Sequence, residues 1–163
     1  MKTLDSNIKH LEQKVKPHYI DVFTDTERHI IVQEAELFRL SIRLYLLRAG
    51  FCYPISHPVV SATIDAAYNL LLELKGHSRT WPLFMIGSEA RTDMRRKQII
   101  RMFENRQRST AVVSLGWIQR ITEKVWLQDD LFDDVGSGRE EALDGQKRLT
   151  VGISTCGGLP TFA

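Results

Sequence analysis

The side chains of this 163-residue chain that could hold a metal ion are few and far apart. Its two cysteines, Cys52 and Cys156, cannot form a four-ligand structural zinc site, still less the six-thiolate cluster of a Zn2Cys6 module. None of the five histidines lies three or four residues from another, which is the spacing that places two ligands on one helix face. We therefore expect no metal and no other cofactor, and the sequence specifies no small-molecule effector.

Nucleophilic chemistry has equally little support in the sequence. There is no Gly-x-Ser-x-Gly motif, and the run Gly136-Ser137-Gly138 lacks the lysine and the helix that would make a phosphate site. Cys52 lies between Phe51 and Tyr53, which predicts an inert, buried thiol. We expect that the chain is not an enzyme.

The strongest local charge lies within residues 91–108, where seven cations face only Asp93 and Glu104. Such a segment could follow the phosphates of a nucleic acid, and its contacts would then be Arg95, Arg96, Lys97 and Arg101. The alternative is a solvated amphipathic helix whose arginine stems cover apolar surface. Asn and Gln, which read base edges, are few here, and the net charge is only +2. We favour the solvated helix.

The elements that would carry these residues are helical. Apolar residues recur every three or four positions over 24–49, 57–75, 92–107 and 109–128, and a weaker pattern covers 3–15. Thr24 and Glu27 have the spacing of a capping box. The apolar arc over 24–49 is wide enough to predict a helix packed on two sides. We predict an all-α fold, an irregular helical bundle or solenoid-like fragment of about five helices with a disordered C-terminal tail.

The most informative segment is the run Trp81-Pro82-Leu83-Phe84-Met85-Ile86-Gly87-Ser88-Glu89-Ala90. Pro82 should keep Trp81 out of the α region and begin a helix at its first turn. The apolar run that follows predicts a buried element, and Gly87 predicts the close approach of another helix. Glu89 is expected to pair with Arg96 or with a cation from an earlier helix. We expect Trp81, Trp117 and Trp126 to be core anchors rather than platforms for stacking bases.

The order W-P-L-F-x-x-G-x-E-A, then a basic helix, then a helix that ends in Val125-Trp126, resembles the C-terminal part of the fungal-specific transcription factor domain. The resemblance covers roughly residues 20–130. It implies a non-catalytic, nuclear regulatory region of a zinc binuclear cluster regulator, which contacts a partner protein or a second copy. The structural motif would comprise Trp81, Pro82, Gly87, Glu89, Trp117 and Trp126. Since the zinc cluster itself is missing from this sequence, we expect a fragment without sequence-specific DNA binding of its own.

Changes in composition along the chain predict its organisation. Residues 1–22 would be an N-terminal segment or linker with a short helix, 23–130 the helical regulatory domain, and 131–163 a polar, Gly-rich, disordered tail. No apolar run approaches the ~20 residues that a membrane span requires, and no secretory signal is visible. We therefore expect an intracellular protein that does not enter a membrane.

Overall fold

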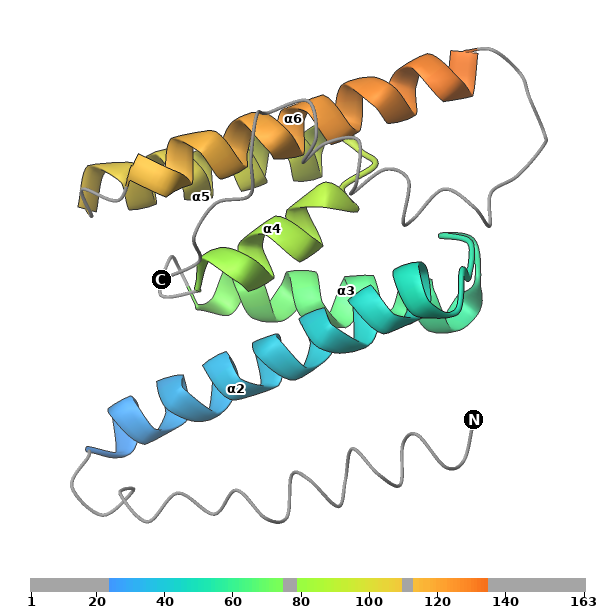
Figure 1. Ribbon diagram of the computed structural model, residues 1–163. Coiled ribbons are helices and arrows are strands. Elements are labelled where there is room, and N and C mark those ends of the chain that lie inside the picture. Colours follow the sequence, from blue (N-terminus) through green and yellow to red (C-terminus); the bar gives the residue numbers. More distant parts are fainter. Residues whose placement is uncertain (1–23, 75–78, 110–112, 135–163) are drawn as a thin grey trace. The chain divides into compact units, whose positions relative to one another are not determined.

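The computed structural model describes residues 24–74, 79–109 and 113–134 of the chain (Figure 1). No strand occurs in these ranges, which confirms the predicted all-α fold. The short helix predicted at 3–15, and the part of the predicted tail beyond residue 134, lie outside the described residues. The helical elements are α2 (Asp25–Tyr45), the π-helical turn η2 (Leu46–Gly50), α3 (Pro58–Glu73), α4 (Thr80–Ser88), α5 (Asp93–Ser109) and α6 (Val113–Asp134).

The chain divides into two compact units, residues 1–32 and 33–163. In the first unit, the structure describes the start of α2. The Glu27 carboxylate accepts a hydrogen bond from the Thr24 backbone N–H at 2.9 Å, and the Glu27 N–H donates to Thr24 Oγ1 at 3.3 Å. This reciprocal pair satisfies backbone donors that a first helical turn leaves unbonded. The predicted capping box is therefore confirmed.

Helix α4 lies at the centre of the second unit, where it contacts α3, α5 and α6 (Figure 1). Every residue from Pro82 to Ala90 is buried, since α4 has neighbours on several sides and needs an apolar surface all round. Helices α5 and α6 run along each other and bury Phe103 and Ile121 between them and α4. A short, largely apolar helix is stable here because its neighbours, rather than its own length, supply the packing energy.

Helix α3 packs against the end of α2 and the turn η2. Leu44 and Leu47 form one apolar cluster with Val60 and Ile64, which α3 contributes. The opposite side of α2 is different: Ile42 is 50% exposed and Tyr45 40% exposed. On this side Tyr45 meets only the edge of α4, through Trp81, so packing on two sides is not confirmed for the C-terminal part of the helix.

Three local expectations also differ from the structure. Trp81 was expected outside the α region, but it lies inside α4, which begins at Thr80. Pro82 is tolerated at the third helical position because the first N–H groups of a helix have no acceptor within it. Cys52, expected to be buried, is half-buried and free. Helix α6 continues to Asp134, beyond the predicted end near residue 128, while the predicted domain limits at 23 and 130 stay predictions.

Candidate functional site

The C-terminal end of α4 is joined to the turn η2 by a buried ion pair. Arg48 Nε lies 3.0 Å from Glu89 Oε1, and the two side chains are only 3% and 8% exposed. Arg48 also donates from Nη1 to the Tyr53 carbonyl at 2.6 Å. Because a charge removed from water needs both a counter-charge and hydrogen bonds, this pair holds the two elements in one register. Of the two alternatives for Glu89, the partner is the cation from an earlier helix.

The same end of α4 is bonded to α6. Trp126 donates from its indole nitrogen to the Gly87 carbonyl at 2.9 Å. A Cβ atom at Gly87 would lie 3.0 Å from Cγ2 of Ile99 in α5 and 3.5 Å from Cγ2 of Thr122 in α6. Glycine therefore suits the close approach of α5, because a Cβ atom here would force the Ile99 side chain to move by a few tenths of an ångström, while the distance to Thr122 is an ordinary van der Waals contact.

Arg96 connects the start of α5 to α6 and to the end of α4. Its guanidinium makes two 2.7 Å hydrogen bonds to the Asp130 carboxylate, donates from Nε to the Ala90 carbonyl at 3.1 Å, and lies 5.5 Å from the Trp126 ring. The hydrogen bond with Asp130 raises the pKa of Arg96, and the same bond lowers the pKa of Asp130. Planar bidentate geometry of this kind is specific to arginine.

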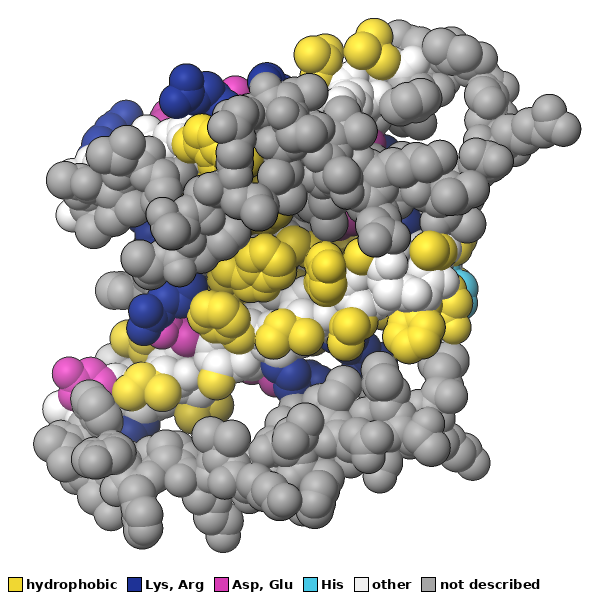
Figure 2. Space-filling view, in the orientation of Figure 1, with side chains coloured by type: hydrophobic (Ala, Val, Ile, Leu, Met, Phe, Trp, Pro, Cys, Tyr) yellow, Lys and Arg dark blue, Asp and Glu magenta, His cyan; other side chains and the backbone are white. Residues whose placement is uncertain are grey.

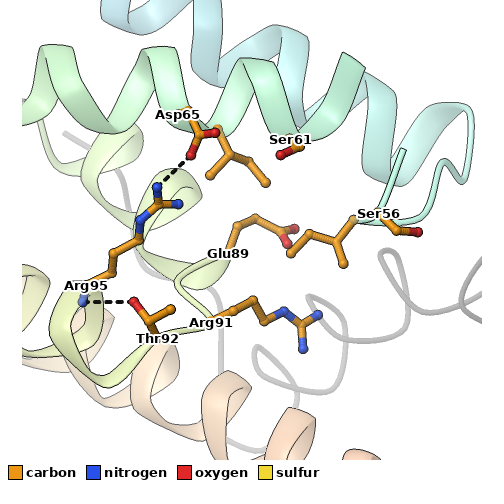
Figure 3. Close-up of a pocket in the computed structure, with 9 residues that line it drawn as sticks. Ser56, Ser61, Asp65, Glu89, Arg91, Thr92 and Arg95 are labelled. Carbon is orange, nitrogen blue, oxygen red and sulfur yellow. Dashed lines mark hydrogen bonds and ion pairs between the residues drawn. The ribbon is translucent and has the colours of Figure 1, made fainter. Parts of the chain in front are cut away.

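We call the C-terminal end of α4, with the residues 89–92 that join it to α5, the α4–α5 corner. A pocket of about 230 Å³ opens beside this corner, between α3 and the start of α5 (Figure 3). Arg95 crosses it, donating to Asp65 at 2.6 Å and lying 4.7 Å above the Tyr68 ring. Tyr68 in turn donates from its hydroxyl to Gln98, and burial raises the pKa of Tyr68. Most of the residues that line the pocket are polar or charged, although apolar atoms make up the larger part of its surface; the members are Ser56, Ser61, Asp65, Glu89, Arg91, Thr92 and Arg95, with Ile55 and Ile64.

The four cations predicted as nucleic-acid contacts are divided by the structure into two pairs. Arg95 and Arg96 are half-buried and bonded to carboxylates of α3 and α6. Lys97 and Arg101 are exposed and lie one turn apart on α5. The segment is therefore not a uniform basic surface, because its N-terminal arginines bind within the protein.

The remaining motif residues occupy different environments. Pro82 and Gly87 are buried in α4, Glu89 is buried at the C-cap of that helix, and Trp126 is buried in α6. Trp81 and Trp117 are half-buried, and the Trp81 ring lies edge-on to Tyr45, with centroids 6.1 Å apart. The sequence analysis missed Arg48, Asp65 and Asp130, the partners of the residues it singled out. Arg48 carried a readable signal, since it follows Leu46-Leu47 in a run that is otherwise apolar.

Two features that the described ranges lack bear on the kind of site. Among the residues of those ranges, no group of three or more His, Cys, Asp or Glu side chains is arranged to hold a metal ion. Within the same part of the chain, no helix is both long enough and apolar enough to cross a bilayer.

Comparison with known proteins gives two matches. The model of a family described as the fungal-specific transcription factor domain matches residues 1–144. A curated protein from Pestalotiopsis fici, "Transcription factor iacI", is 28% identical over 130 residues, which cover 78% of this chain and 32% of that protein. The chain therefore spans about a third of the length of this relative. No solved structure matches the chain significantly.

Proposed function

Since the chain belongs to the family of fungal-specific transcription factor domains, which function in transcription regulation, we propose that it acts through protein contacts rather than by reading DNA. In this proposal it is a non-catalytic helical domain that works in the nucleus. Its partner is a second copy of the same chain, bound through the exposed apolar face of α2. The two cysteines of this sequence cannot supply the thiolates of a zinc binuclear cluster, which is why we assign it the regulatory rather than the DNA-reading role.

The observation that carries this proposal is the apolar surface formed by Ile42, Tyr45 and Trp81, which we call the α2 face. Ile42 and Tyr45 lie one turn apart, and the half-buried Trp81 continues the surface onto α4 through its contact with Tyr45. Figure 2 shows apolar side chains gathered over the C-terminal part of α2 and the start of α4. Aromatic residues of this kind are enriched at the centres of protein interfaces.

A second copy is the occupant that fits this surface best. Both molecules then present the same patch, so that each Tyr45 and Ile42 finds an apolar partner across a two-fold axis. Burying apolar area contributes about 25 cal/mol per Å², and two neighbouring large side chains at 40–50% exposure leave such area to bury. The charged residues of the α4–α5 corner already have partners in their own chain, so this corner does not require a second copy.

Light scattering coupled to gel filtration, over a range of protein concentrations, tests this proposal. The unmodified chain is expected to dimerise, and Ile42→Glu or Tyr45→Glu is expected to give a monomer with unchanged helical circular dichroism. Met94→Glu is the matched control, because Met94 is 67% exposed on α5, away from the α2 face, and should leave the dimer intact. A chain that stays monomeric at every concentration, or a dimer that survives both α2 substitutions, refutes the proposal.

The alternative is a nucleic-acid-binding module that uses the basic helix within 91–108. Lys97 and Arg101 favour it, because both are exposed on one face of α5. The internal bonds of Arg95 and Arg96 weigh against it. In a gel shift, direct binding through Lys97 and Arg101 would show a salt dependence whose logarithmic slope falls by about 0.9 for each phosphate contact removed by Lys97→Ala or Arg101→Ala. If no shift occurs even at low salt, this alternative is excluded.

A further inference from the structure

The pocket beside the α4–α5 corner has two walls of opposite character. Figure 3 shows Asp65 and Ser61 on α3 at one side, and Arg91, Thr92 and Arg95 on the α4–α5 side, with Glu89 between them. Its volume, about 230 Å³, is below the ~300–1,000 Å³ of pockets for drug-sized ligands, so its ligand would be a small metabolite.

The α4–α5 wall offers hydrogen-bond donors that the protein does not use. Each guanidinium carries five N–H donors. Among the described residues, Arg95 makes one hydrogen bond from its side chain, to Asp65, while Arg91 lies 3.3 Å from Asp129 and its buried Nε atom has no hydrogen-bond partner there. The N-terminal end of α5 lies at the same wall and adds positive potential. This wall is therefore suited to a carboxylate.

The α3 wall offers a carboxylate that only one exposed ion pair occupies. The Asp65 side chain is 53% exposed, and within the described part of the chain its one partner is Arg95, bonded through one of its two oxygens. An ion pair exposed to this extent contributes little to stability, so a ligand can open it easily. The hydroxyl of Ser61, also exposed, lies on the same helix one turn earlier.

Charge balance selects the ligand class. An anion that took Arg95 would leave Asp65 without a cation, and a cation that took Asp65 would leave Arg95 without an anion. A molecule with one carboxylate and one ammonium group gives both charges a partner, because it replaces the single pair with two; water can hydrate these partly exposed charges but supplies no counter-charge. From this geometry we propose that the pocket binds a small zwitterion, a free α-amino acid. Its carboxylate lies against Arg95 and Arg91, and its ammonium group lies against Asp65.

Such a ligand would add contacts between the two walls of the pocket. It would touch α3 on one side and the α4–α5 corner on the other, so binding would stabilise the arrangement of these helices that forms the pocket. The proposal does not rest on dimerisation through the α2 face. A monomeric Ile42→Glu chain is expected to bind the same amino acid with the same affinity, so the two ideas fail separately.

The test is a thermal-shift screen of the full chain against the standard amino acids, with succinate, phosphate and putrescine as singly-signed probes, followed by calorimetric titration. At least one amino acid should raise the melting temperature and bind with one-to-one stoichiometry. Its N-acetyl form and its carboxamide form, which each lack one charge, should bind at least about ten-fold more weakly, as expected for the loss of a charged hydrogen bond.

Three variants locate the binding. Arg95→Gln should weaken it at least about ten-fold, and Ser61→Phe should abolish it by filling the pocket. Ala62→Phe is the control, because Ala62 is exposed on the same helix and does not line the pocket. The proposal is overturned if no amino acid binds, if succinate, phosphate or putrescine binds in place of one, if a capped form binds equally well, or if Ser61→Phe binds as the unmodified chain does.

Discussion

Substituting Glu89 by Gln isolates the charge of the buried pair, because glutamine keeps the shape of the side chain and can still accept a hydrogen bond. Arg48 is 3% exposed, so it would be left as a buried cation with no counter-charge. Removing one partner of a buried pair costs about 3–5 kcal/mol. Against a typical stability of roughly 5–15 kcal/mol, that is a large fraction of the total. In a chain of this size it corresponds to a fall in melting temperature of roughly 6–20 °C, at ~2–4 °C per kcal/mol.

The assay is urea denaturation followed by circular dichroism, with two comparison variants. In Arg48→Met/Glu89→Leu both charges are gone, and stability should return to within about 1–2 kcal/mol of the unmodified chain, the residual cost being the lost bond to the Tyr53 carbonyl. Glu36→Gln breaks a pair with Arg39 that is about one-third exposed, and it should cost at most about 1 kcal/mol. The reasoning is refuted if Glu89→Gln costs less than this surface control, or if the double variant is as unstable as the single one.

Three further perturbations test the packing around α4. Gly87→Ala should destabilise the chain by about 1–3 kcal/mol, because its Cβ would lie 3.0 Å from a methyl group of Ile99. Gly116→Ala, whose Cβ would have nothing within 4 Å, should stabilise the chain by roughly 0.5–1 kcal/mol. Equal effects of the two substitutions in a urea titration would contradict the close approach of Ile99 to Gly87. Trp126→Phe replaces the indole by a smaller aromatic ring and removes the indole donor to the Gly87 carbonyl, which then keeps its bond from the Ala90 N–H; it should cost about 1–3 kcal/mol, whereas an unchanged melting temperature would show that the indole bond contributes nothing. The pKa of Asp130 is lowered in the folded chain by its hydrogen bond with Arg96, so the stabilisation from this pair is present above the ordinary aspartate pKa and is lost as the pH falls through the lowered value. Asp130→Asn should therefore flatten the acid limb of the pH–stability curve, and an acid limb identical to that of the unmodified chain would rule this contribution out.

The features that could be predicted from the sequence are those fixed by short-range rules. The capping box of Thr24 and Glu27 depends on four consecutive residues, and both hydrogen bonds are present. The cap of α3 is equally local: the His57 ring nitrogen accepts from the Val59 N–H at 3.3 Å, ahead of Pro58. Such signals involve only neighbouring residues, so no knowledge of the tertiary fold is needed to read them.

The errors arose where a local rule competes with the position of an element in the fold. The residue before a proline avoids the α region in general because it clashes with the proline ring, but this is a preference that the surrounding packing can override, and Trp81 is helical. The wide apolar arc of α2 was correctly read as more than one face, but composition cannot show whether the second face meets the same chain or another one. Ile42 and Tyr45 are exposed because α3 packs on the other side.

Ion pairs between residues far apart in the chain could not be predicted from the sequence, for a different reason. Arg48 and Glu89 are 41 residues apart, and Arg96 and Asp130 are 34 apart. Many carboxylates could pair with any one arginine, so charge alone does not choose a partner. The basic segment was therefore counted as an excess of positive charge, although three of its arginines, Arg91, Arg95 and Arg96, find acceptors on α3 and α6.

The residue types of the block at 81–90 are constrained because its helix is buried to its end. The last carbonyl groups of any helix lack partners within it, and at a buried end water cannot replace them. In α4 the Gly87 carbonyl accepts from Trp126, and just beyond its end the Ala90 carbonyl accepts from Arg96. The side chain of Glu89, carried into the same buried corner, is bonded to Arg48. The polar positions of the block are therefore set by donors on η2, α5 and α6, and substituting one of these donors should disturb the corner as much as substituting the block itself.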